Sequence, residues 1–340
     1  MRGVLILGDG KVVVESFPDP KPGWGEVVVA MKAAAICGSD LHYYRATAAE
    51  RGEGARVIPG HEPSGVVVEV GEGVRNVKVG DRVSVYHYRG CGHCPQCVGG
   101  NIMWCESRHG YGWHEHGSDA DLLLTDERNC LPLPDDMSFA TGALFACNTA
   151  TAWSSLAKLS PNGRSTLVVS GLGPVGLNGV MLASKMGPRI IGIDVSPTRL
   201  ELAKKLGADE VIDASKEDVV QAVMKLTGGK GADLAFETSG NGKAQAAIPE
   251  FLGYYGKAAF VGVGAKQPSI FPASIVGKQL TLMGSFVAPI NAYYDMLDFV
   301  RKHRIDLDKM VTHRVPLEDA PAAFKMANDA ECGKIIFEWT

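Results

Sequence analysis

Four cysteines lie close together in one short segment of the chain. Cys91, Cys94, Cys97 and Cys105 follow the pattern C-x2-C-x2-C-x7-C. Four thiolates on one loop form the ligand set of a closed tetrahedral zinc site, which orders a segment that lacks an apolar core of its own. Disulfides and an iron–sulfur cluster are the alternatives. His93 lies inside the loop and is a substitute ligand, although four cysteines already suffice.

A second motif is typical of phosphate binding. The run G-L-G-P-V-G matches G-x-G-x-x-G, and its positions are Gly171, Gly173, Pro174, Val175 and Gly176. Its glycines allow the backbone to approach a pyrophosphate at a helix N-terminus. The alternative is a glycine-rich turn that binds nothing.

An acidic residue lies at about the expected distance of ~20 residues beyond this motif. Asp194 ends the next strand candidate, where its carboxylate is expected to bind the ribose hydroxyls of a dinucleotide and to repel a 2′-phosphate. NAD is therefore expected rather than NADP. Arg199, five residues further on, either contacts the ribose or is a solvated arginine of the first helical turn.

The elements that must hold these residues fall into two kinds. Before about residue 148, short β-branched runs such as 26–30 and 65–70 are separated by proline and glycine clusters. From about residue 166, strand and helix candidates alternate, which predicts a doubly wound parallel sheet. The strand candidates are Thr166–Ser170, Arg189–Asp194, Glu210–Ile212, Leu234–Glu237, Ala258–Val261 and Leu280–Met283, and a closing β segment is expected at Lys334–Glu338. Pro197–Leu206 is a helix candidate that Gly207 would end.

Composition excludes several classes of partner. The chain has 340 residues, of which 46% are hydrophobic and 21% charged, enough for two globular domains. A net charge of -4 offers no basic field for nucleic acid or for an anionic membrane. No apolar run is long enough to cross a bilayer, and the N-terminus lacks a secretory pattern. A cytoplasmic protein is expected, which favours metal binding over disulfides for clustered cysteines.

Two further groups, C-G-S-D-L-H at residues 37–42 and G-H-E at residues 60–62, are weak signals when taken singly. Together with the cysteine cluster and the glycine motif, they resemble the zinc-containing alcohol dehydrogenases of the medium-chain dehydrogenase/reductase family. The resemblance covers essentially the whole chain, and it includes the order and spacing of the motifs. It implies an α/β fold with a GroES-like, partly open β-barrel catalytic domain at residues 1–148 and 288–340. An NAD-binding Rossmann domain would occupy residues 149–287, with substrate between the two domains.

The same resemblance implies a catalytic zinc bound by Cys37, His61 and Cys147. Three protein ligands leave one position for a substrate oxygen, and the metal acts as a Lewis acid while hydride passes to the nicotinamide. Ser39 would accept the alcohol proton and relay it through the cofactor ribose to His42. Two carboxylates complete the site by resemblance: Asp40 would fix the tautomer of His61, and Glu62 would bind the metal transiently or accept a buried salt bridge.

The family also implies further contacts with the cofactor. The backbone of Val261, Ser285 and Val287 would hold the carboxamide, and Val263 is a further expected cofactor contact. Lys334 would contact a phosphate, in place of a basic residue that the family often has at the position of Gly38.

His87 takes the position of an aromatic wall of the substrate pocket in related alcohol dehydrogenases. Further polar residues lie on segments that can approach the cleft: Tyr43, Tyr44, Arg45, Arg89, Trp113, His114 and His116. A polar substrate is therefore expected, a hydroxylated or anionic alcohol, unless these side chains face solvent. A polyol dehydrogenase is an alternative, although that branch usually has glutamate at the position of Cys147. His114 and His116 are a weak candidate for a third metal site.

Two rival functions remain at this stage. A zinc-free quinone reductase of the same superfamily would keep the glycine motif but would bind no zinc. A non-catalytic NAD-binding redox sensor would keep the fold without turnover. The favoured function is a zinc-dependent oxidoreductase with two zinc ions per chain and NAD, acting on a small alcohol or carbonyl compound. Microbial relatives of this length imply a homo-oligomer, with a tetramer favoured.

Overall fold

The computed structural model describes residues 1–264 and 270–339, which form two compact units. The first unit comprises Met1–Ala150, Ala288–Asp295 and Val311–Thr340, and the second comprises Thr151–Val287 and Met296–Met310. This division differs from the predicted domains chiefly at residues 296–310. The reason is that η4 (Leu307–Met310) packs against α6 (Pro174–Ala183) and α7 (Pro197–Leu206) of the second unit.

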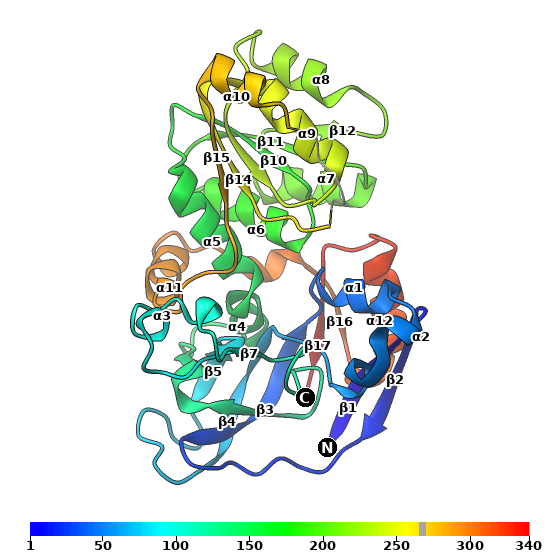
Figure 1. Cartoon of the computed structure of the whole chain (residues 1–340), viewed down its shortest axis with the longest axis vertical. Coiled ribbons are helices and arrows are strands. Elements are labelled where there is room, and N and C mark those ends of the chain that lie inside the picture. The colour runs from blue at the N-terminus through cyan, green and yellow to red at the C-terminus, as the bar shows by residue number, and fades with distance from the viewer. Residues whose placement is uncertain (265–269, 340) are drawn as a thin grey trace. The chain divides into compact units, whose positions relative to one another are not determined.

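The first unit is built on a mostly antiparallel sheet of seven strands (Figure 1). Its strands run in the order β16-β17-β3-β4-β5-β9, with β8 paired to β3, and only β16 and β17 are parallel. Their bounds are β3 Glu26–Ala35, β4 Pro63–Val70, β5 Arg82–Val85, β8 Leu122–Asp126, β9 Cys130–Pro132, β16 Val311–Val315 and β17 Lys334–Glu338. Strand β17 has the bounds that the sequence predicted, because its run of apolar residues lies between a glycine and the chain end.

Two hairpin-like pairs and several short helices complete the first unit. The paired strands are β1 (Arg2–Gly8) with β2 (Lys11–Ser16), and β6 (Tyr88–Arg89) with β7 (His109–Gly110). The helices are α1 Asp40–Arg45, α2 Ala48–Arg51, α3 Pro95–Val98, α4 Phe139–Ala146 and α12 Ala320–Asn328, with 3-10 turns η1 Gly52–Arg56, η2 Ile102–Trp104, η3 Glu127–Asn129 and η5 Leu317–Asp319. Helix α4 is buried along almost its whole length and packs on β3, β4 and β5.

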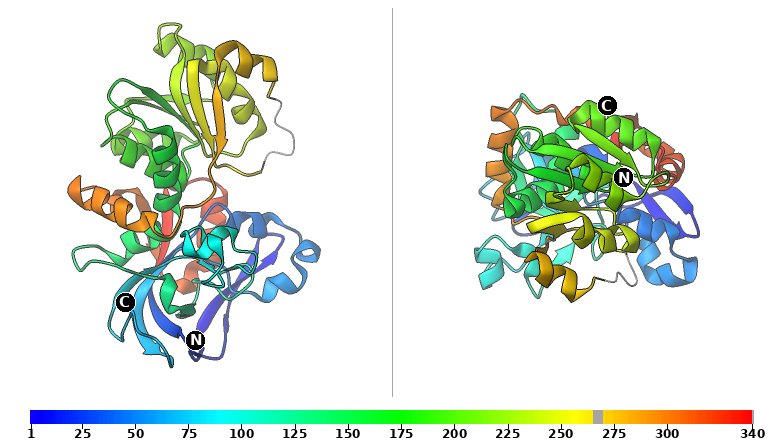
Figure 2. Two further views of the ribbon diagram at one scale, coloured as in Figure 1. Left: turned by 60° about the vertical axis from the view of Figure 1, so that its left-hand side comes forward. Right: turned by 90° about the horizontal axis from the view of Figure 1, so that it is seen from above.

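The second unit is the predicted parallel, doubly wound sheet. Its strand order is β12-β11-β10-β13-β14-β15, and the order reverses between β10 and β13. Helices cover both faces of the sheet (Figure 2). Helices α6 and α7 lie together on one face, and α8, α9 and α10 lie together on the other. The strands are β10 Thr166–Ser170, β11 Arg189–Asp194, β12 Glu210–Asp213, β13 Ala232–Glu237, β14 Leu252–Phe260 and β15 Thr281–Gly284. The remaining helices are α8 Val219–Leu226, α9 Gly242–Phe251 and α10 Pro272–Lys278, while α5 (Asn148–Leu159) and α11 (Ala292–Lys302) have residues in both units.

Sequence periodicity predicted this second unit well. Strands β10 and β11 and helix α7 have the predicted bounds, and Gly207 ends α7 in the left-handed conformation with φ 119°. Strand β14 begins six residues earlier than predicted, at Leu252. The burial of its residues does not alternate strictly, and its pairing with β13 shifts register between Ala232 and Leu234, so periodicity in the sequence does not mark its start. None of the described helices is long and apolar enough to span a membrane.

Candidate active site

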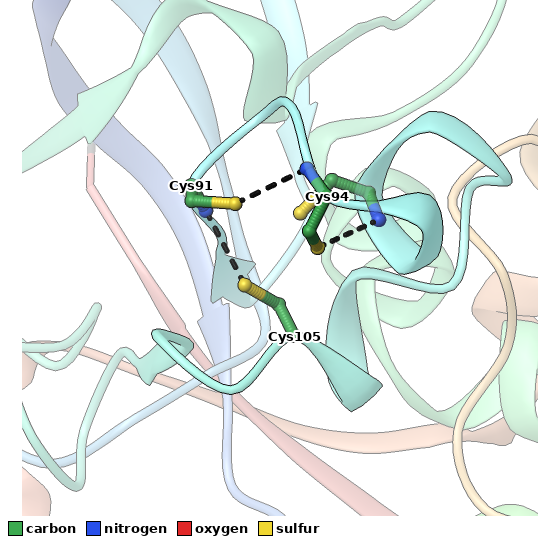
Figure 3. Close-up of side chains that lie close together, drawn as sticks. Cys91, Cys94 and Cys105 are labelled. Carbon is green, nitrogen blue, oxygen red and sulfur yellow. Dashed lines mark hydrogen bonds between the residues drawn. The ribbon is translucent and has the colours of Figure 1, made fainter.

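The four clustered cysteines converge in the structure. Cys91, Cys94 and Cys105 direct their sulfurs toward one centre (Figure 3), and the ligand atoms of all four cysteines lie within 4.8 Å of one another. Backbone N–H groups support the sulfurs: Cys94 N donates to Cys91 Sγ and Cys97 N to Cys94 Sγ, each at 3.4 Å. Sulfurs around a tetrahedral zinc ion are about 3.8 Å apart, so this donor set fits zinc.

The electrostatics of the loop that carries the four cysteines, here called the cysteine lobe (residues 91–105), also suit a metal. The backbone N–H of His93, followed by that of Cys94, lowers the pKa of the Cys91 thiol to about 6. Burial raises the pKa of the Cys97 thiol to about 12, and a cation must therefore displace that proton when it binds. The side chain of His93 is exposed and its Nδ1 lies 3.0 Å from the carbonyl oxygen of Cys91, so it does not belong to the donor set.

A second donor set gathers residues that are far apart in the sequence. The ligand atoms of Cys37, His61, Glu62 and Cys147 lie within 4.8 Å of one another, and all four residues are buried. Pairing of Ala34 in β3 with Pro63 in β4 brings Cys37 close to the pair His61 and Glu62. Helix α4, which packs on both strands, delivers Cys147 at its C-terminal end. Two thiols and an imidazole are ligands that zinc prefers, so this set also fits the metal.

Two residues of the C-G-S-D segment orient the ring of His61. Asp40 Oδ1 lies 3.2 Å from His61 Nδ1, and Asp40 Oδ2 accepts a hydrogen bond of 2.8 Å from the backbone N–H of Cys37. Ser39 Oγ lies 3.3 Å from His61 Nε2. The Nδ1 edge thus faces a carboxylate and the Nε2 edge is the one available to a metal. His42 lies on the exposed side of α1, where its ring lies beside that of Tyr43.

Glu62 is held by Lys334 and Asn148. Neither residue was predicted in this role from the sequence. Lys334 Nζ lies 2.6 Å from Glu62 Oε2 and donates to the carbonyl oxygen of Ile36 at 2.7 Å, and both charged residues are fully buried. Asn148 Nδ2 donates to Glu62 Oε1 at 2.9 Å and lies 3.8 Å from Cys37 Sγ. The ammonium of Lys334 is thus engaged beside the donor set, and its contact with a cofactor phosphate stays a prediction. Asn148 directly follows the predicted ligand Cys147, and this position is the sequence signal that could have revealed its role beside the donor set.

The titrating groups of this set are strongly perturbed. A hydrogen bond from the Cys147 thiol lowers the pKa of Cys37 well below its usual range, and the same bond raises the pKa of Cys147. Burial alone would lower the pKa of His61, but the charges of Asp40 and Cys37 outweigh it and raise that pKa. Burial raises the pKa of Glu62 despite the charge of Lys334. A buried cluster of acidic groups in this state favours a divalent cation, whose charge replaces the protons.

His87 is buried next to the second donor set. Its ring centroid is 5.4 Å from that of His61, and its Nδ1 lies 2.7 Å from the carbonyl oxygen of Ala146. Because that oxygen can only accept, Nδ1 carries a proton and Nε2 of the neutral ring is an acceptor. Burial, followed by the charge of His61, lowers the pKa of His87 to about 3, which keeps the ring neutral.

Most of the other polar residues that the sequence suggested for the pocket are engaged elsewhere. Arg89 pairs with Glu26 and Glu115, so its guanidinium is engaged by carboxylates of the first unit. Tyr43 and Tyr44 pack against the core cluster around α12, and Arg45 donates to Asn328. The described residues offer no further metal cluster that includes the histidines of the His-Glu-His segment. Each of these histidines instead accepts a backbone hydrogen bond: His114 from Gly110 N and His116 from Ile58 N, both at 3.1 Å.

The glycine motif forms a compact turn at the carboxyl end of β10. Gly171 has φ 92°, and a Cβ on Gly176 would lie 1.9 Å from the Gly171 carbonyl oxygen, so both positions require glycine. Gly173 has no atom within 4 Å of its Cβ position and is the N-cap of α6, whose first residue is Pro174. The first turn of α6, which includes Val175, therefore presents backbone N–H groups at an open helix N-terminus, as pyrophosphate binding requires.

Asp194 lies next to this turn and supports it. Its Oδ2 accepts from Leu172 N at 2.6 Å, and its Oδ1 accepts from Val195 N and Ser196 N at 2.8 and 2.9 Å. Arg199 lies in the first turn of α7, partly buried. Glu237, at the end of β13, is a residue that sequence reasoning missed: it is buried, and its Oε1 accepts from the N–H groups of Ser239 and Gly240. An acidic residue at the end of a parallel strand was the available signal.

The remaining residues predicted to contact the cofactor follow the carboxyl ends of two neighbouring strands. Val261 and Val263 come after β14, and Ser285 and Val287 after β15. Val263 is exposed, whereas Ser285 is buried and its Oγ accepts from Lys158 Nζ at 3.1 Å. These residues thus share the edge of the sheet at which the glycine motif lies, where ligands of open α/β sheets bind.

Comparison with known proteins agrees with both units. An alcohol dehydrogenase GroES-like domain matches residues 23–135, and a zinc-binding dehydrogenase domain matches residues 174–302. The chain is 35% identical to the uncharacterized zinc-type alcohol dehydrogenase-like protein YphC of Escherichia coli, covering 100% of this chain and 99% of that protein. It is 31% identical to an L-threonine 3-dehydrogenase of Rhizobium johnstonii, with 96% and 94% covered.

Among solved structures, alcohol dehydrogenase TADH from Thermus sp. ATN1 superposes with a TM-score of 0.91 at 30% identity, over 99% of each chain. Fold, donor sets and similarity therefore define an oxidoreductase with a GroES-like unit and a Rossmann-type unit. The chain belongs to the zinc-containing alcohol dehydrogenases of the medium-chain dehydrogenase/reductase family.

Proposed function

We propose that this protein transfers hydride between a polar alcohol and NAD, with one catalytic and one structural zinc ion in each chain. The observation that carries the proposal is the buried donor set of Cys37, His61 and Cys147, with Ser39 on the Nε2 edge of the histidine. Zinc at this set supplies Lewis-acid polarisation of the substrate oxygen, and NAD supplies the hydride acceptor. The four-cysteine lobe is closed by its own thiols and is therefore the structural site.

The chain's own residues account for orientation and for proton movement. Asp40 holds the Nδ1 edge of His61 so that Nε2 faces the donor set. The hydroxyl of Ser39, 3.3 Å from Nε2, is the proposed acceptor of the substrate proton, and exposed His42 is the proposed final acceptor. Lys334 and Asn148 hold Glu62 beside the metal ligands. The homo-oligomer, with a tetramer favoured, stays a prediction.

The decisive test of this function is NAD reduction with a panel of alcohols by the zinc-loaded protein. The panel contains simple aliphatic and aromatic alcohols, vicinal diols and polyols, and hydroxy acids. Polar members should turn over best, since the neutral ring of His87 is a buried hydrogen-bond acceptor beside the metal ligands. The similarity to L-threonine 3-dehydrogenases, whose substrate has polar groups beside its hydroxyl, supports this expectation. No turnover of any alcohol would favour the redox-sensor alternative.

Replacing His87 by phenylalanine is expected to lower kcat/KM for diols and polyols by about tenfold, because a substrate hydroxyl would lose its acceptor at a cost of about 1–3 kcal/mol. Simple aliphatic alcohols should be unaffected. The matched control is His93→Phe, which changes an exposed histidine of the cysteine lobe. The idea fails if His87→Phe improves turnover of aliphatic alcohols and leaves that of polar alcohols untouched.

Replacing Asp194 by glycine is expected to shift the ratio of kcat/KM for NAD and NADP at least about tenfold toward NADP, since a negative charge that opposes the 2′-phosphate is removed. The same change also removes an acceptor of three backbone N–H groups, so both cofactors should bind more weakly. Asp209→Gly is the control, because Asp209 also accepts a backbone hydrogen bond, from Ile190 N, at the opposite edge of the sheet. An unchanged ratio in Asp194→Gly would refute the assigned role.

A further inference from the structure

The ring of His61 is supported on its face as well as on its edges. Asp40 and Ser39 contact the two nitrogen edges, as described above. The indole of Trp113 lies over the ring at a centroid distance of 4.5 Å and an interplanar angle of 32°. His87 approaches edge-on at 64°. The two polar contacts act at the edges of the imidazole, whereas the tilted indole packs against its face and so opposes rotation of the ring about the Cβ–Cγ bond.

The position of Trp113 is fixed by contacts within its own loop. A Cβ on Gly110 would lie 2.4 Å from the indole, so the missing side chain there lets the indole pack directly on the backbone. Tyr88 stacks on the indole from another direction, with ring centroids 5.8 Å apart and an angle of 23°. His114 Nδ1 accepts from Gly110 N and closes the turn that carries Trp113.

The same loop is bound to the segment that precedes His61. Gly117 N donates to Ile58 O at 2.8 Å, Ser118 N to Gly60 O at 3.0 Å and Asp119 N to Pro59 O at 3.0 Å. In the reverse direction, Ile58 N donates to His116 Nδ1 at 3.1 Å. Arg89, paired with both Glu26 and Glu115, ties the middle of the loop to strand β3. Residues 110–119, which we name the clamp loop, thus contact the ring of His61 through Trp113 and hold the backbone of the three residues before it, 58–60.

We propose that Trp113 is a positioning residue for the metal ligand His61 and that the clamp loop, through His114, Glu115 and His116, exists to hold it there. This inference rests on the proposed zinc site. It assigns a role to the His-Glu-His segment that neither metal binding nor substrate binding provides. Groups that orient a metal-binding histidine typically change metal affinity by about 10–100-fold when they are removed. Loss of the indole should therefore weaken zinc binding at His61 and leave the four-cysteine site unaffected.

The test is the rate at which each zinc ion leaves the full-length, zinc-loaded protein in the presence of a colorimetric chelator. In Trp113→Ala the zinc ion of the Cys37 set should dissociate about tenfold or more faster than in the wild type. Trp113→Phe keeps an aromatic face and should restore slow release. Trp24→Ala, which removes an indole that is 77% exposed, is the control for loss of a tryptophan. Release from the four-cysteine site is the internal reference in every variant.

A second pair of variants tests the loop without touching the indole. In His116→Asn the amide oxygen can replace Nδ1 as the acceptor for Ile58 N, whereas His116→Ala offers no acceptor. Faster zinc release in His116→Ala but not in His116→Asn supports the proposal. A changed ligand-field spectrum of cobalt-substituted His116→Ala supports it as well. Unchanged release in both Trp113→Ala and His116→Ala overturns it. A wild type that binds only one zinc ion refutes the proposed function and, with it, this inference. Two bound zinc ions with unchanged release in the variants refute this inference alone, so the two failures are distinguishable.

Discussion

Replacing Cys147 by alanine is expected to remove one of two zinc ions from each chain and to lower the turnover of alcohols at least about a thousandfold. Lewis-acid stabilisation is worth several kcal/mol, and each 1.36 kcal/mol is a factor of ten in rate. Cys147 supplies one of the two thiols in its donor set. Glu62 cannot freely replace it, because Lys334 and Asn148 already engage its two oxygens.

The measurement is zinc content by atomic emission, together with kcat for a responding alcohol. Cys130→Ala is the matched control, since Cys130 is likewise a buried thiol of the first unit but lies outside both donor sets. It should keep two zinc ions and near-normal turnover. If Cys147→Ala kept both zinc ions and near-normal turnover, Cys147 would not be a required ligand, and the ligand set proposed here would be wrong.

Replacing Ser39 by alanine should have the next largest effect, a loss of about 10²–10⁴-fold in kcat, which is the usual contribution of a positioned proton acceptor. The Ser39 hydroxyl lies 3.3 Å from His61 Nε2, on the edge of the ring that faces the donor set. Zinc content should be unchanged, because Ser39 does not belong to that set. This separates the effect of Ser39→Ala from that of Cys147→Ala.

Two measurements on Ser39→Ala distinguish proton transfer from a structural role. The solvent deuterium isotope effect on kcat should increase, because proton release would become slower than hydride transfer. Ser39→Thr retains a hydroxyl and should recover most of the lost rate. Near-normal kcat in Ser39→Ala would show that the proton leaves by a route that does not include this hydroxyl, and His42 would then lose its proposed place as well.

Local spacing in the sequence sufficed for the features that depend on a short stretch of backbone. The cysteine lobe needs only the turn between Cys91 and Cys105, and the turn after β10 needs only glycines at 171 and 176, where a Cβ would be strained or would clash. The parallel sheet was also predictable, because each strand and helix leaves its own periodicity in the sequence. The family resemblance correctly indicated which dispersed residues meet, namely Cys37, His61 and Cys147.

Only the tertiary structure decided how those dispersed residues are held. Strand β17 carries Lys334 to the end of β3, where its ammonium is buried against Glu62. Nothing local to Lys334 distinguishes that role from a solvent-exposed contact with phosphate. Similarly, Arg89 is charged and near the cysteine lobe, yet its partners come from β3 and the clamp loop. Contacts between distant segments depend on strand pairing and helix packing, and one residue's type and neighbours do not specify them.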